Sequence, residues 1–348
     1  MSLKKRALGK TGMKVTEIGF GGIPIQRVSE DEAVKVVRKC YELGINYFDT
    51  ARGYTTSEAR IGLALKDVRD DVFIATKSHA KLAKELNENL EKSLDNLKTN
   101  YIDLYQLHNV SNEQSWETIK SKDGALQGLI EARDKGKVLH IGVTSHSPQL
   151  LMKIIEEDIF ESIMVGYNYL AVEPEKELLP RCRKLGIGSV IMKPFGGGAL
   201  SNSNTALKYI IANKDVDVVI PGMMTVKEVE ENIKICQGNL TLTSEELSSI
   251  KNDKELLGDQ FCSACDYCQP CPAGISISFV LRTEQSALKR MGWNEGIVKQ
   301  TKDMASKVEG CLQCGECESR CPYQLPIRQL IPEKMGSLLK RLETRSIP

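Results

Sequence analysis

The 348-residue sequence lacks a long apolar run, an excess of one charge and an apolar stretch of the kind that forms a signal-peptide core. Without about eighteen consecutive apolar residues, a membrane-spanning helix is not expected. The formal net charge of +1 at pH 7 gives no electrostatic basis for binding nucleic acid or an anionic membrane surface. We therefore expect a cytoplasmic globular protein with no nucleic-acid or membrane partner.

Cysteine is scarce in the first 240 residues, where Cys40, Cys182 and Cys236 stand alone. We expect these three to be small buried hydrophobic residues. The other eight of the 11 cysteines all fall between Cys262 and Cys321. Because a reducing compartment disfavours disulfides, this concentration of cysteine predicts metal binding.

Short β-branched runs alternate with longer amphipathic segments through most of the chain, which is typical of a parallel sheet built from βα units. The expected strands are Val15–Phe20, Ile45–Phe48, Val72–Thr76, Ile102–Gln106, Val138–Val143, Ile163–Val165, Gly188–Met192 and Val216–Ile220. The expected helices between them include Glu30–Leu43, Leu82–Leu97, Ser115–Lys135 and Val226–Cys236. Eight repeats predict an α/β fold, a closed (β/α)₈ TIM barrel.

A doubly wound sheet is the alternative to the barrel. Such a sheet usually carries a Gly-x-Gly-x-x-Gly turn after its first strand. Gly19, Gly21 and Gly22 follow the first expected strand without that spacing, so the barrel is favoured.

The βα pattern stops after Asn239, and we predict a barrel domain over residues 1–258 and a second domain over residues 259–348. A short helix after Leu240 is expected to be capped by Thr243 or Ser244. Further helical segments are expected at Ile277–Ser306 and, as a basic amphipathic tail, at Pro332–Arg345.

The cysteines of the second domain form two runs. They are Cys262-x₂-Cys265-x₂-Cys268-x₂-Cys271-Pro272 and Cys311-x₂-Cys314-x₂-Cys317-x₃-Cys321-Pro322. Three cysteines at this spacing can surround three corners of a cubane cluster. The alternative is zinc, but zinc sites rarely use three equally spaced cysteines followed by Cys-Pro, and here the pattern occurs twice. The runs therefore predict two [4Fe–4S] clusters.

The two runs resemble those of two-cluster ferredoxins, in which the fourth cysteine of each run binds the other cluster. That resemblance implies that Cys262, Cys265 and Cys268 share a cluster with Cys321. It likewise implies that Cys311, Cys314 and Cys317 share one with Cys271. The first run departs from the usual pattern in having two residues before its fourth cysteine. The long segment between the runs favours a mainly helical ferredoxin-like domain.

Polar residues follow three consecutive expected strands of the barrel. Asp49, Lys77 and His108 each stand where a strand ends, and Tyr54 lies in the loop after Asp49. The active sites of (β/α)₈ barrels gather at this end of the strands, so we expect these four side chains to meet at one rim.

The four residue types suit the reduction of a carbonyl group. A phenol with a pKa near 10 is a weak acid at neutral pH, and a nearby Lys77 ammonium should lower the pKa of Tyr54. Asp49 would keep the lysine charged and fixed, and His108 would bind the substrate oxygen or relay a proton. Tyr54 would then protonate the oxygen as hydride reaches the carbon.

These motifs resemble those of the aldo-keto reductase family over residues Lys5–Gly238. The matching segments are Leu8-Gly-Lys-Thr-Gly-Met-Lys-Val, Phe48-Asp-Thr-Ala-Arg-Gly-Tyr54, Ala75-Thr-Lys77, Asp103-Leu-Tyr-Gln-Leu-His108 and Ile220-Pro-Gly with Glu231-Asn232. The family's catalytic tetrad maps onto Asp49, Tyr54, Lys77 and His108.

The resemblance implies that NADP or NAD binds across the barrel mouth, with its phosphates near the loops after the seventh and eighth strands. The implied cofactor-binding residues are Thr144, Ser145, Met192, Lys193, Gly196, Gly197, Gly222, Met224, Thr225, Glu228, Glu231 and Asn232.

The sequence departs from the family at several of these positions. Met192 stands where an aromatic ring often stacks on the nicotinamide, Thr144-Ser145 replaces Ser-Asn, and Met164 replaces a glutamine. The serine or arginine that commonly recognises a 2′-phosphate is missing around Met223-Met224. Lys193 and Lys227 remain as cationic contacts, which gives a mild preference for NADPH. His79 and His146 are expected to be polar loop residues.

Two functions are consistent with this organisation. The first is an NAD(P)H-dependent oxidoreductase that reduces a small aldehyde or ketone, with clusters that exchange electrons with a redox partner protein or serve as a scaffold. The second is an electron-transfer or redox-sensing module that retains a nucleotide-binding barrel. Hydride carries two electrons and each cluster usually passes one, and no flavin motif is visible to convert between them. A separately bound flavin would resolve that mismatch.

Overall fold

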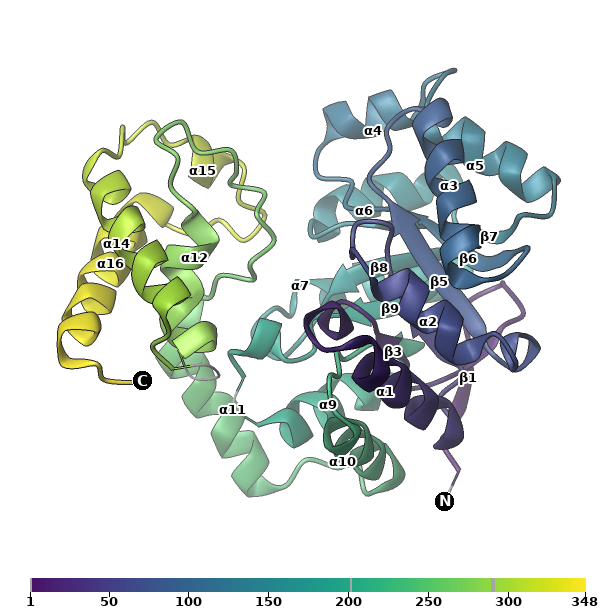
Figure 1. Ribbon diagram of the computed structural model, residues 1–348, viewed down its shortest axis with the longest axis horizontal. Coiled ribbons are helices and arrows are strands. Elements are labelled where there is room, and N and C mark those ends of the chain that lie inside the picture. The colour runs from purple at the N-terminus through teal and green to yellow at the C-terminus, as the bar shows by residue number, and fades with distance from the viewer. Residues whose placement is uncertain (1, 201, 289–291) are drawn as a thin grey trace. The chain divides into compact units, whose positions relative to one another are not determined.

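The computed structural model describes residues 2–200, 202–288 and 292–348, and the chain divides into two compact units (Figure 1). The first unit comprises Met1–Pro194 and Asn202–Glu246, and the second comprises Phe195–Ser201 and Leu247–Pro348. The predicted domain boundary between residues 258 and 259 stays a proposal. The predicted helical segment Ile277–Ser306 includes residues 289–291, which lie outside the described residues.

The first unit is built around an eight-stranded parallel sheet whose strands follow one another in chain order, as predicted. Its strands are β3 (Phe20–Gly21), β4 (Tyr47–Asp49), β5 (Phe73–Ser78), β6 (Ile102–Leu107), β7 (Val138–Thr144), β8 (Ser162–Gly166), β9 (Gly188–Met192) and β10 (Val218–Val219). Parallel bridges Ile18–Val219 and Gly21–Gly222 join the last strand to the first. The sheet therefore closes into the predicted (β/α)₈ barrel.

The first predicted strand, Val15–Phe20, is wrong as a single element. Its first half belongs to an antiparallel hairpin of β1 (Lys5–Ala7) and β2 (Lys14–Thr16), and only its end enters the barrel as β3. The hairpin residues Leu8, Met13 and Val15 are buried in one apolar cluster with side chains of the barrel strands. All residues of Val15–Phe20 are buried, so burial does not mark where the hairpin ends and β3 begins.

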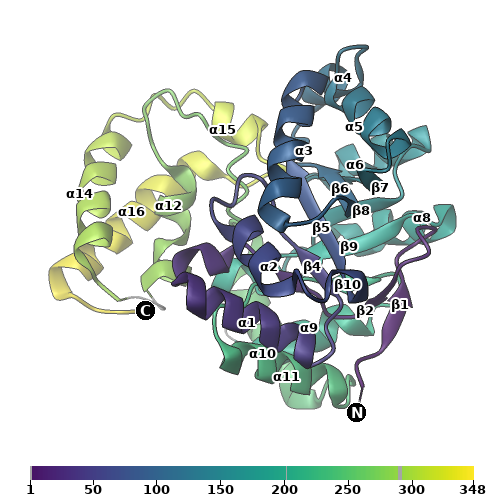
Figure 2. The same ribbon diagram turned by 45° about the vertical axis from the view of Figure 1, so that its right-hand side comes forward.

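Helices lie outside the strands of the first unit (Figure 2). They are α1 (Glu30–Glu42), α2 (Ser57–Leu65), α3 (Ala83–Leu97), α4 (Glu113–Lys120), α5 (Ala125–Asp134), α6 (Pro148–Ile154), α7 (Glu173–Lys176), α8 (Leu178–Leu185), α9 (Ser203–Ala212) and α10 (Val226–Gln237). Ser29 and Glu32 start α1 with a reciprocal capping box. The predicted helix Ser115–Lys135 is instead α4 and α5, broken at Gly124, where a Cβ would lie 2.1 Å from the Ile119 carbonyl oxygen.

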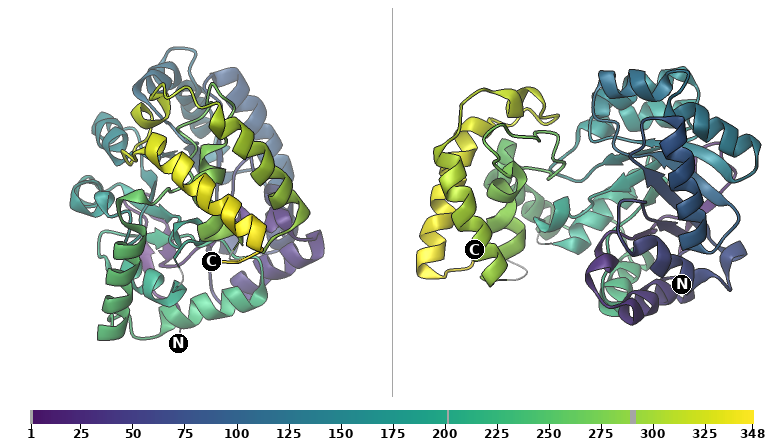
Figure 3. Two further views of the ribbon diagram at one scale, coloured as in Figure 1. Left: turned by 90° about the vertical axis from the view of Figure 1, so that its left-hand side faces the viewer. Right: turned by 45° about the horizontal axis from the view of Figure 1, so that its top comes forward.

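The second unit is helical in its described part, as predicted. Its elements are most of α11 (Ser244–Leu257), η5 (Gly258–Gln260), α12 (Ile277–Arg282), the π-helical turn η6 (Thr283–Leu288), α14 (Glu295–Glu309), α15 (Glu316–Ser319) and α16 (Ile327–Thr344). Helices α12 and α14 both pack against α16 (Figure 3). Thr243 caps α11: its hydroxyl accepts from the Glu246 N–H at 3.2 Å.

Helix α16 starts at Ile327, five residues before the predicted start at Pro332. Proline removes one helical hydrogen bond but still adopts helical φ. The apolar side chains of Ile327, Leu330 and Ile331 are buried in the core of the second unit, and their burial holds this first turn in place. Among the described residues, no helix is long and apolar enough to cross a membrane.

The three isolated cysteines are buried, as predicted, with exposed fractions of 0% for Cys40 and Cys182 and 4% for Cys236. Burial raises the pKa of Cys182 and of Cys236 to about 12. These thiols therefore stay protonated at neutral pH and act as apolar packing groups.

A buried carboxylate on α2 fixes the strand that carries Lys77. Glu58, which is 1% exposed, accepts hydrogen bonds from Thr76 Oγ1 at 2.8 Å, Ser93 Oγ at 2.7 Å and Asn96 Nδ2 at 3.2 Å. Arg52 forms an ion pair with the same carboxylate. The network joins α2, β5 and α3, and so holds β5 in place next to the barrel mouth.

Replacing this carboxylate should destabilise the barrel. In Glu58→Ala, the hydroxyls of Thr76 and Ser93 and the Arg52 guanidinium lose their shared partner, which should cost about 3 kcal/mol or more. The midpoint of urea unfolding of the full chain, followed by far-UV circular dichroism, should fall accordingly. Glu88→Ala on the exposed face of α3 is the control. Equal midpoints for the two variants would contradict this role of Glu58.

Candidate functional site

The four predicted catalytic residues come together at the carboxyl ends of neighbouring strands. Asp49 is the last residue of β4, His108 directly follows β6, and Tyr54 lies in the loop between β4 and α2. Lys77 lies within β5 rather than after it, because β5 continues to Ser78. In the parallel register Asp49 pairs with Ala75 and Lys77 pairs with Gln106, which brings all these positions to the same rim.

Asp49 and Lys77 form a buried ion pair in which Lys77 Nζ lies 2.5 Å from Asp49 Oδ1. Their exposed fractions are 2% and 1%. The lysine also donates to the Thr50 carbonyl oxygen at 2.7 Å, and Gln106 Nε2 donates to Asp49 Oδ2 at 3.2 Å. Both charges are therefore compensated by direct polar contacts.

Tyr54 and His108 are half-buried beside this ion pair. Their rings meet edge to face, with centroids 5.8 Å apart and planes at 82°. Lys77 Nζ lies 5.3 Å from the centroid of the Tyr54 ring. The half-buried rings of Tyr54 and His108 thus lie beside the buried charges of Asp49 and Lys77.

Burial sets the protonation of the two accessible groups. It raises the pKa of the Tyr54 phenol, and the opposing effect of the Lys77 ammonium is smaller. The expectation that Lys77 lowers the pKa of Tyr54 overall is therefore wrong, because desolvation of a phenolate exceeds the attraction of the cation. Burial, with the Lys77 charge, lowers the pKa of His108 well below its usual value. At neutral pH the phenol is protonated and the imidazole is neutral.

The ion pair has a matching effect on its own carboxylate. Burial raises the pKa of the Asp49 carboxyl, while the Lys77 ammonium and the Gln106 amide favour the carboxylate and limit that rise. Direct contact with the ammonium keeps Asp49 ionised at neutral pH.

Two neighbours of the tetrad were assigned no role in the site from the sequence: Gln106, and His79, which was expected to be a polar loop residue. The exposed loop residue His79 stacks on His108, with ring centroids 3.9 Å apart and planes at 16°, and Gln106 holds Asp49. A signal for both existed, because Gln106 precedes His108 by two residues and His79 follows Lys77 by two. Alternate residues of a strand lie on the same face.

Thr144 and Ser145, predicted to contact the nicotinamide, are buried at the end of β7. Thr144 Oγ1 accepts from the Asn109 N–H at 2.7 Å, and Ser145 Oγ donates to the Val110 carbonyl oxygen at 2.7 Å. Both side chains therefore bind the loop that follows His108. Thr144 still has a hydroxyl hydrogen to donate.

The predicted phosphate loop after β9 is shared between the two compact units. Met192 ends β9 and packs on the barrel core, and Lys193 adopts a positive φ of 56°. Gly196 and Gly197 belong to the second unit. There their carbonyl oxygens accept hydrogen bonds from Arg282 Nη2 at 2.6 and 3.3 Å.

The segment that leads into α10 carries the other predicted cofactor residues. Thr225 and Glu228 form a reciprocal capping box, and the Glu228 carboxylate also accepts from the Met224 N–H at 2.6 Å. Gly222 and Glu231 are exposed, whereas Asn232 is buried. A carboxylate thus accepts from the N–H groups of Met224 and Thr225, which directly precede this helix.

The eight clustered cysteines surround two hollows in the second unit. One hollow is lined by Cys262, Cys265, Cys268 and Cys321. The other is lined by Cys271, Cys311, Cys314 and Cys317. Each hollow is thus lined by the four cysteines that the crossed pairing assigns to one cluster.

An arginine of the second cysteine run binds the segment that precedes Cys271 in the first run. Arg320, which precedes Cys321, donates to the carbonyl oxygens of Gln269 and Pro270 at 3.3 and 3.0 Å. These two residues directly precede Cys271. These hydrogen bonds hold the segment before Cys271 close to the residue that precedes Cys321.

Comparison with known proteins agrees with both parts of the chain. The model of the aldo/keto reductase family matches residues 17–206, and that of a 4Fe-4S dicluster domain matches residues 261–326. L-galactose dehydrogenase of Arabidopsis thaliana is 27% identical over 307 residues, which cover 74% of this chain and 93% of the plant protein. The uncharacterized oxidoreductase YqkF of Bacillus subtilis is 25% identical over 303 residues, which cover 72% of this chain and 96% of that protein.

Solved structures show the same relationship. The holo form of the aldo-keto reductase AKR11C1 from Bacillus halodurans superposes with a TM-score of 0.63 at 28% identity, covering 72% of this chain and 96% of that one. The family match spans more than half of this sequence. The chain therefore belongs to the aldo/keto reductase family of oxidoreductases, and it carries a 4Fe-4S dicluster domain after the reductase barrel.

Proposed function

We propose that this enzyme reduces a small aldehyde or ketone with NAD(P)H, and that Tyr54 is the proton donor. The observation that carries the proposal is the buried Asp49–Lys77 ion pair beneath the half-buried rings of Tyr54 and His108. This arrangement offers a protonated phenol and a fixed cation to one incoming oxygen atom.

Each residue of the tetrad has a distinct task in this proposal. Tyr54 donates its proton to the carbonyl oxygen, and its raised pKa keeps that proton available. Lys77 stabilises the negative charge that develops on the oxygen, and Asp49 holds the lysine in place. His108, whose imidazole is neutral at neutral pH, orients the substrate oxygen by a hydrogen bond. The bound nicotinamide supplies the hydride.

The nucleotide-binding residues include a negative charge that bears on the choice of cofactor. The Glu228 carboxylate binds the Met224 and Thr225 N–H groups, in the region where the family recognises a 2′-phosphate. Lys227, predicted to attract that phosphate, forms an ion pair with Glu231, with Lys227 Nζ 3.7 Å from Glu231 Oε1. We therefore expect NADH to bind at least as well as NADPH.

We further propose that the two cysteine sets each hold a [4Fe–4S] cluster, with Cys271 and Cys321 exchanged between the runs. Bound clusters would pass single electrons. The chain contributes four thiolates to each hollow and an apolar core that continues from Cys262 and Cys268 to the surrounding helices. In this proposal the clusters exchange electrons with a redox partner protein or stabilise the fold.

A second candidate function is electron transfer or redox sensing with little carbonyl reduction. The observation that favours it is the exposure of Cys314 and of its neighbour Leu312, which is 67% exposed. A ligand loop open to solvent would allow a partner to approach the cluster closely.

Removing the phenolic hydroxyl tests the proposed proton donor. Tyr54→Phe should lower kcat for a probe such as 4-nitrobenzaldehyde by at least about 100-fold, because the oxygen loses its acid. Nucleotide binding, measured by quenching of protein fluorescence, should stay unchanged. Tyr41→Phe, on the outer helix α1, is the control. Unchanged reductase activity in Tyr54→Phe would refute the assignment.

The pH dependence of reduction follows from the direction of the pKa shifts. Tyr54 acts as an acid, so its raised pKa keeps the enzyme active through neutral pH and up to about 10. The lowered pKa of His108 keeps the imidazole neutral over the same range. Saturated rates should be flat between about pH 7 and 9 and should fall only above this range. A fall centred near pH 7 would contradict both assignments.

Glu228 provides a test of nucleotide choice. Glu228→Gln removes the negative charge near the proposed 2′-phosphate position, and it should lower KM for NADPH relative to NADH by about three- to tenfold. Glu230→Gln, an exposed position on the same helix, should leave the ratio unchanged. If both variants changed the ratio equally, the position of the Glu228 charge would not matter.

A further inference from the structure

The two cysteine hollows differ in the charges that line them. The hollow of Cys271, Cys311, Cys314 and Cys317, here called the second hollow, is also lined by Arg320 and Arg328. The hollow of Cys262, Cys265, Cys268 and Cys321, here called the first hollow, is lined by the acidic residue Asp266 and otherwise by uncharged side chains.

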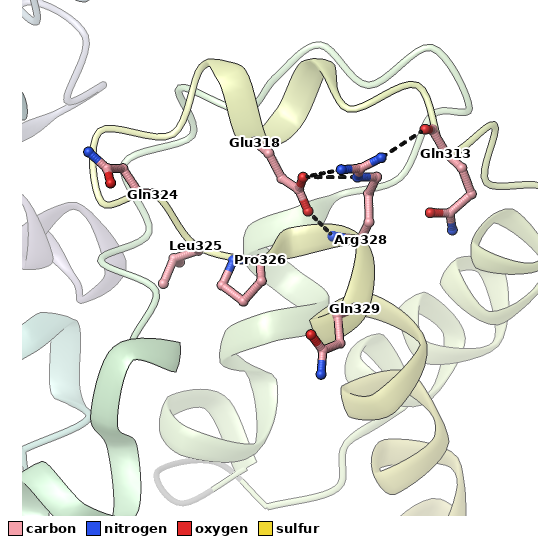
Figure 4. Close-up of a pocket in the computed structure, with 7 residues that line it drawn as sticks. All are labelled: Gln313, Glu318, Gln324, Leu325, Pro326, Arg328 and Gln329. Carbon is pink, nitrogen blue, oxygen red and sulfur yellow. Dashed lines mark hydrogen bonds and ion pairs between the residues drawn. The ribbon is translucent and has the colours of Figure 1, made fainter.

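Arg328 lies between the second hollow and the protein surface. It lines that hollow, and it also lines a surface depression with Glu318, Gln313 and Gln329 (Figure 4). Its Nε and Nη2 lie 2.9 and 2.8 Å from Glu318 Oε2, and its backbone N–H donates to Glu318 Oε1 at 2.9 Å. Of this ion pair only Arg328 lines the second hollow, while Glu318 follows Cys317 in the chain and lines the depression.

The two hollows also differ in their access to solvent. In the first, Cys262 and Cys268 are 8% and 7% exposed. In the second, Cys314 is exposed, and Leu312, which follows Cys311, is 67% exposed.

Both the difference in charge and the difference in solvent access affect the reduction equilibrium of a bound cluster. Reduction of a cluster adds one negative charge to a site that already holds four thiolates. Positive neighbours and solvent stabilise that charge, whereas a nearby carboxylate and burial oppose it. Arg328 and exposure favour reduction at the second hollow, while Asp266 and burial disfavour it at the first.

We propose that the cluster in the second hollow has the higher reduction potential of the two, and that Arg328 is a positioning residue that raises it. This inference rests on the proposal that each hollow holds a [4Fe–4S] cluster. Ile277 lines both hollows, so the two sites are neighbours. A single electron then moves from the first cluster, which is oxidised, to the second, which is reduced, and no bond or proton changes. The electron collects at the solvent-exposed end.

The test is an anaerobic redox titration of the holoenzyme with dithionite, followed by electron paramagnetic resonance. Two reduction steps should be resolved. Arg328→Gln should lower only the higher midpoint, by up to about tenfold in the reduction equilibrium, which is about 59 mV for one electron. Arg328→Lys should keep most of the wild-type value, because the charge is retained. Asp266→Asn should raise only the lower midpoint.

Controls separate this inference from the cluster proposal beneath it. Arg345→Gln, exposed at the end of α16, should leave both midpoints unchanged. Eight iron atoms per chain with coincident midpoints would overturn this inference and leave the two-cluster proposal standing. A lysine variant that shifts as far as the glutamine variant would overturn the proposed role of the Arg328 charge. Four iron atoms or fewer per chain would overturn the two-cluster proposal and this inference together.

Discussion

The ion pair between Asp49 and Lys77 is the interaction on which the reductase site depends. Two charges with exposed fractions of 2% and 1% have lost nearly all contact with water. Such burial costs several kcal/mol per ion and is offset only by close contact and further hydrogen bonds. Here the Thr50 carbonyl and the Gln106 amide supply those bonds. The pair thus requires β4, β5 and β6 to keep one register.

This fixed ion pair explains how the Tyr54 phenol, a weak acid at neutral pH, would serve as the proton donor in the proposed reaction. The ion pair places a cation near the Tyr54 ring, where it would stabilise charge on a bound oxygen in the proposed reaction. The same burial keeps the phenol protonated and the His108 imidazole neutral. The site therefore combines a proton donor, a neutral hydrogen-bonding group and a fixed positive charge, which is what carbonyl reduction requires. The cysteine sets of the second unit are organised differently, because Cys262 and Cys268 belong to its apolar core. Metal binding and folding should accordingly be coupled there.

Regular patterns made much of the molecule predictable. The βα alternation gave the barrel, and strand ends gave Asp49 and His108 their places, because side-chain direction repeats along a strand. The sequence did not separate the β1–β2 hairpin from β3, since the β-branched run that begins in β2 continues to β3. The direction of the Tyr54 pKa was also missed, because burial is a property of the assembled barrel. So was the engagement of Gly196 and Gly197 by Arg282, which is 85 residues from the nearer glycine.

The proposed function requires that hydride passes directly to a carbonyl carbon at the Tyr54 site. The most direct measurement is anaerobic reduction of 4-nitrobenzaldehyde with [4,4-²H₂]NADH in ordinary water, followed by mass spectrometry of the alcohol. Direct transfer predicts one deuterium on the carbinol carbon. A route in which clusters pass single electrons and water supplies the proton would leave that carbon unlabelled. An unlabelled alcohol would therefore contradict direct hydride transfer.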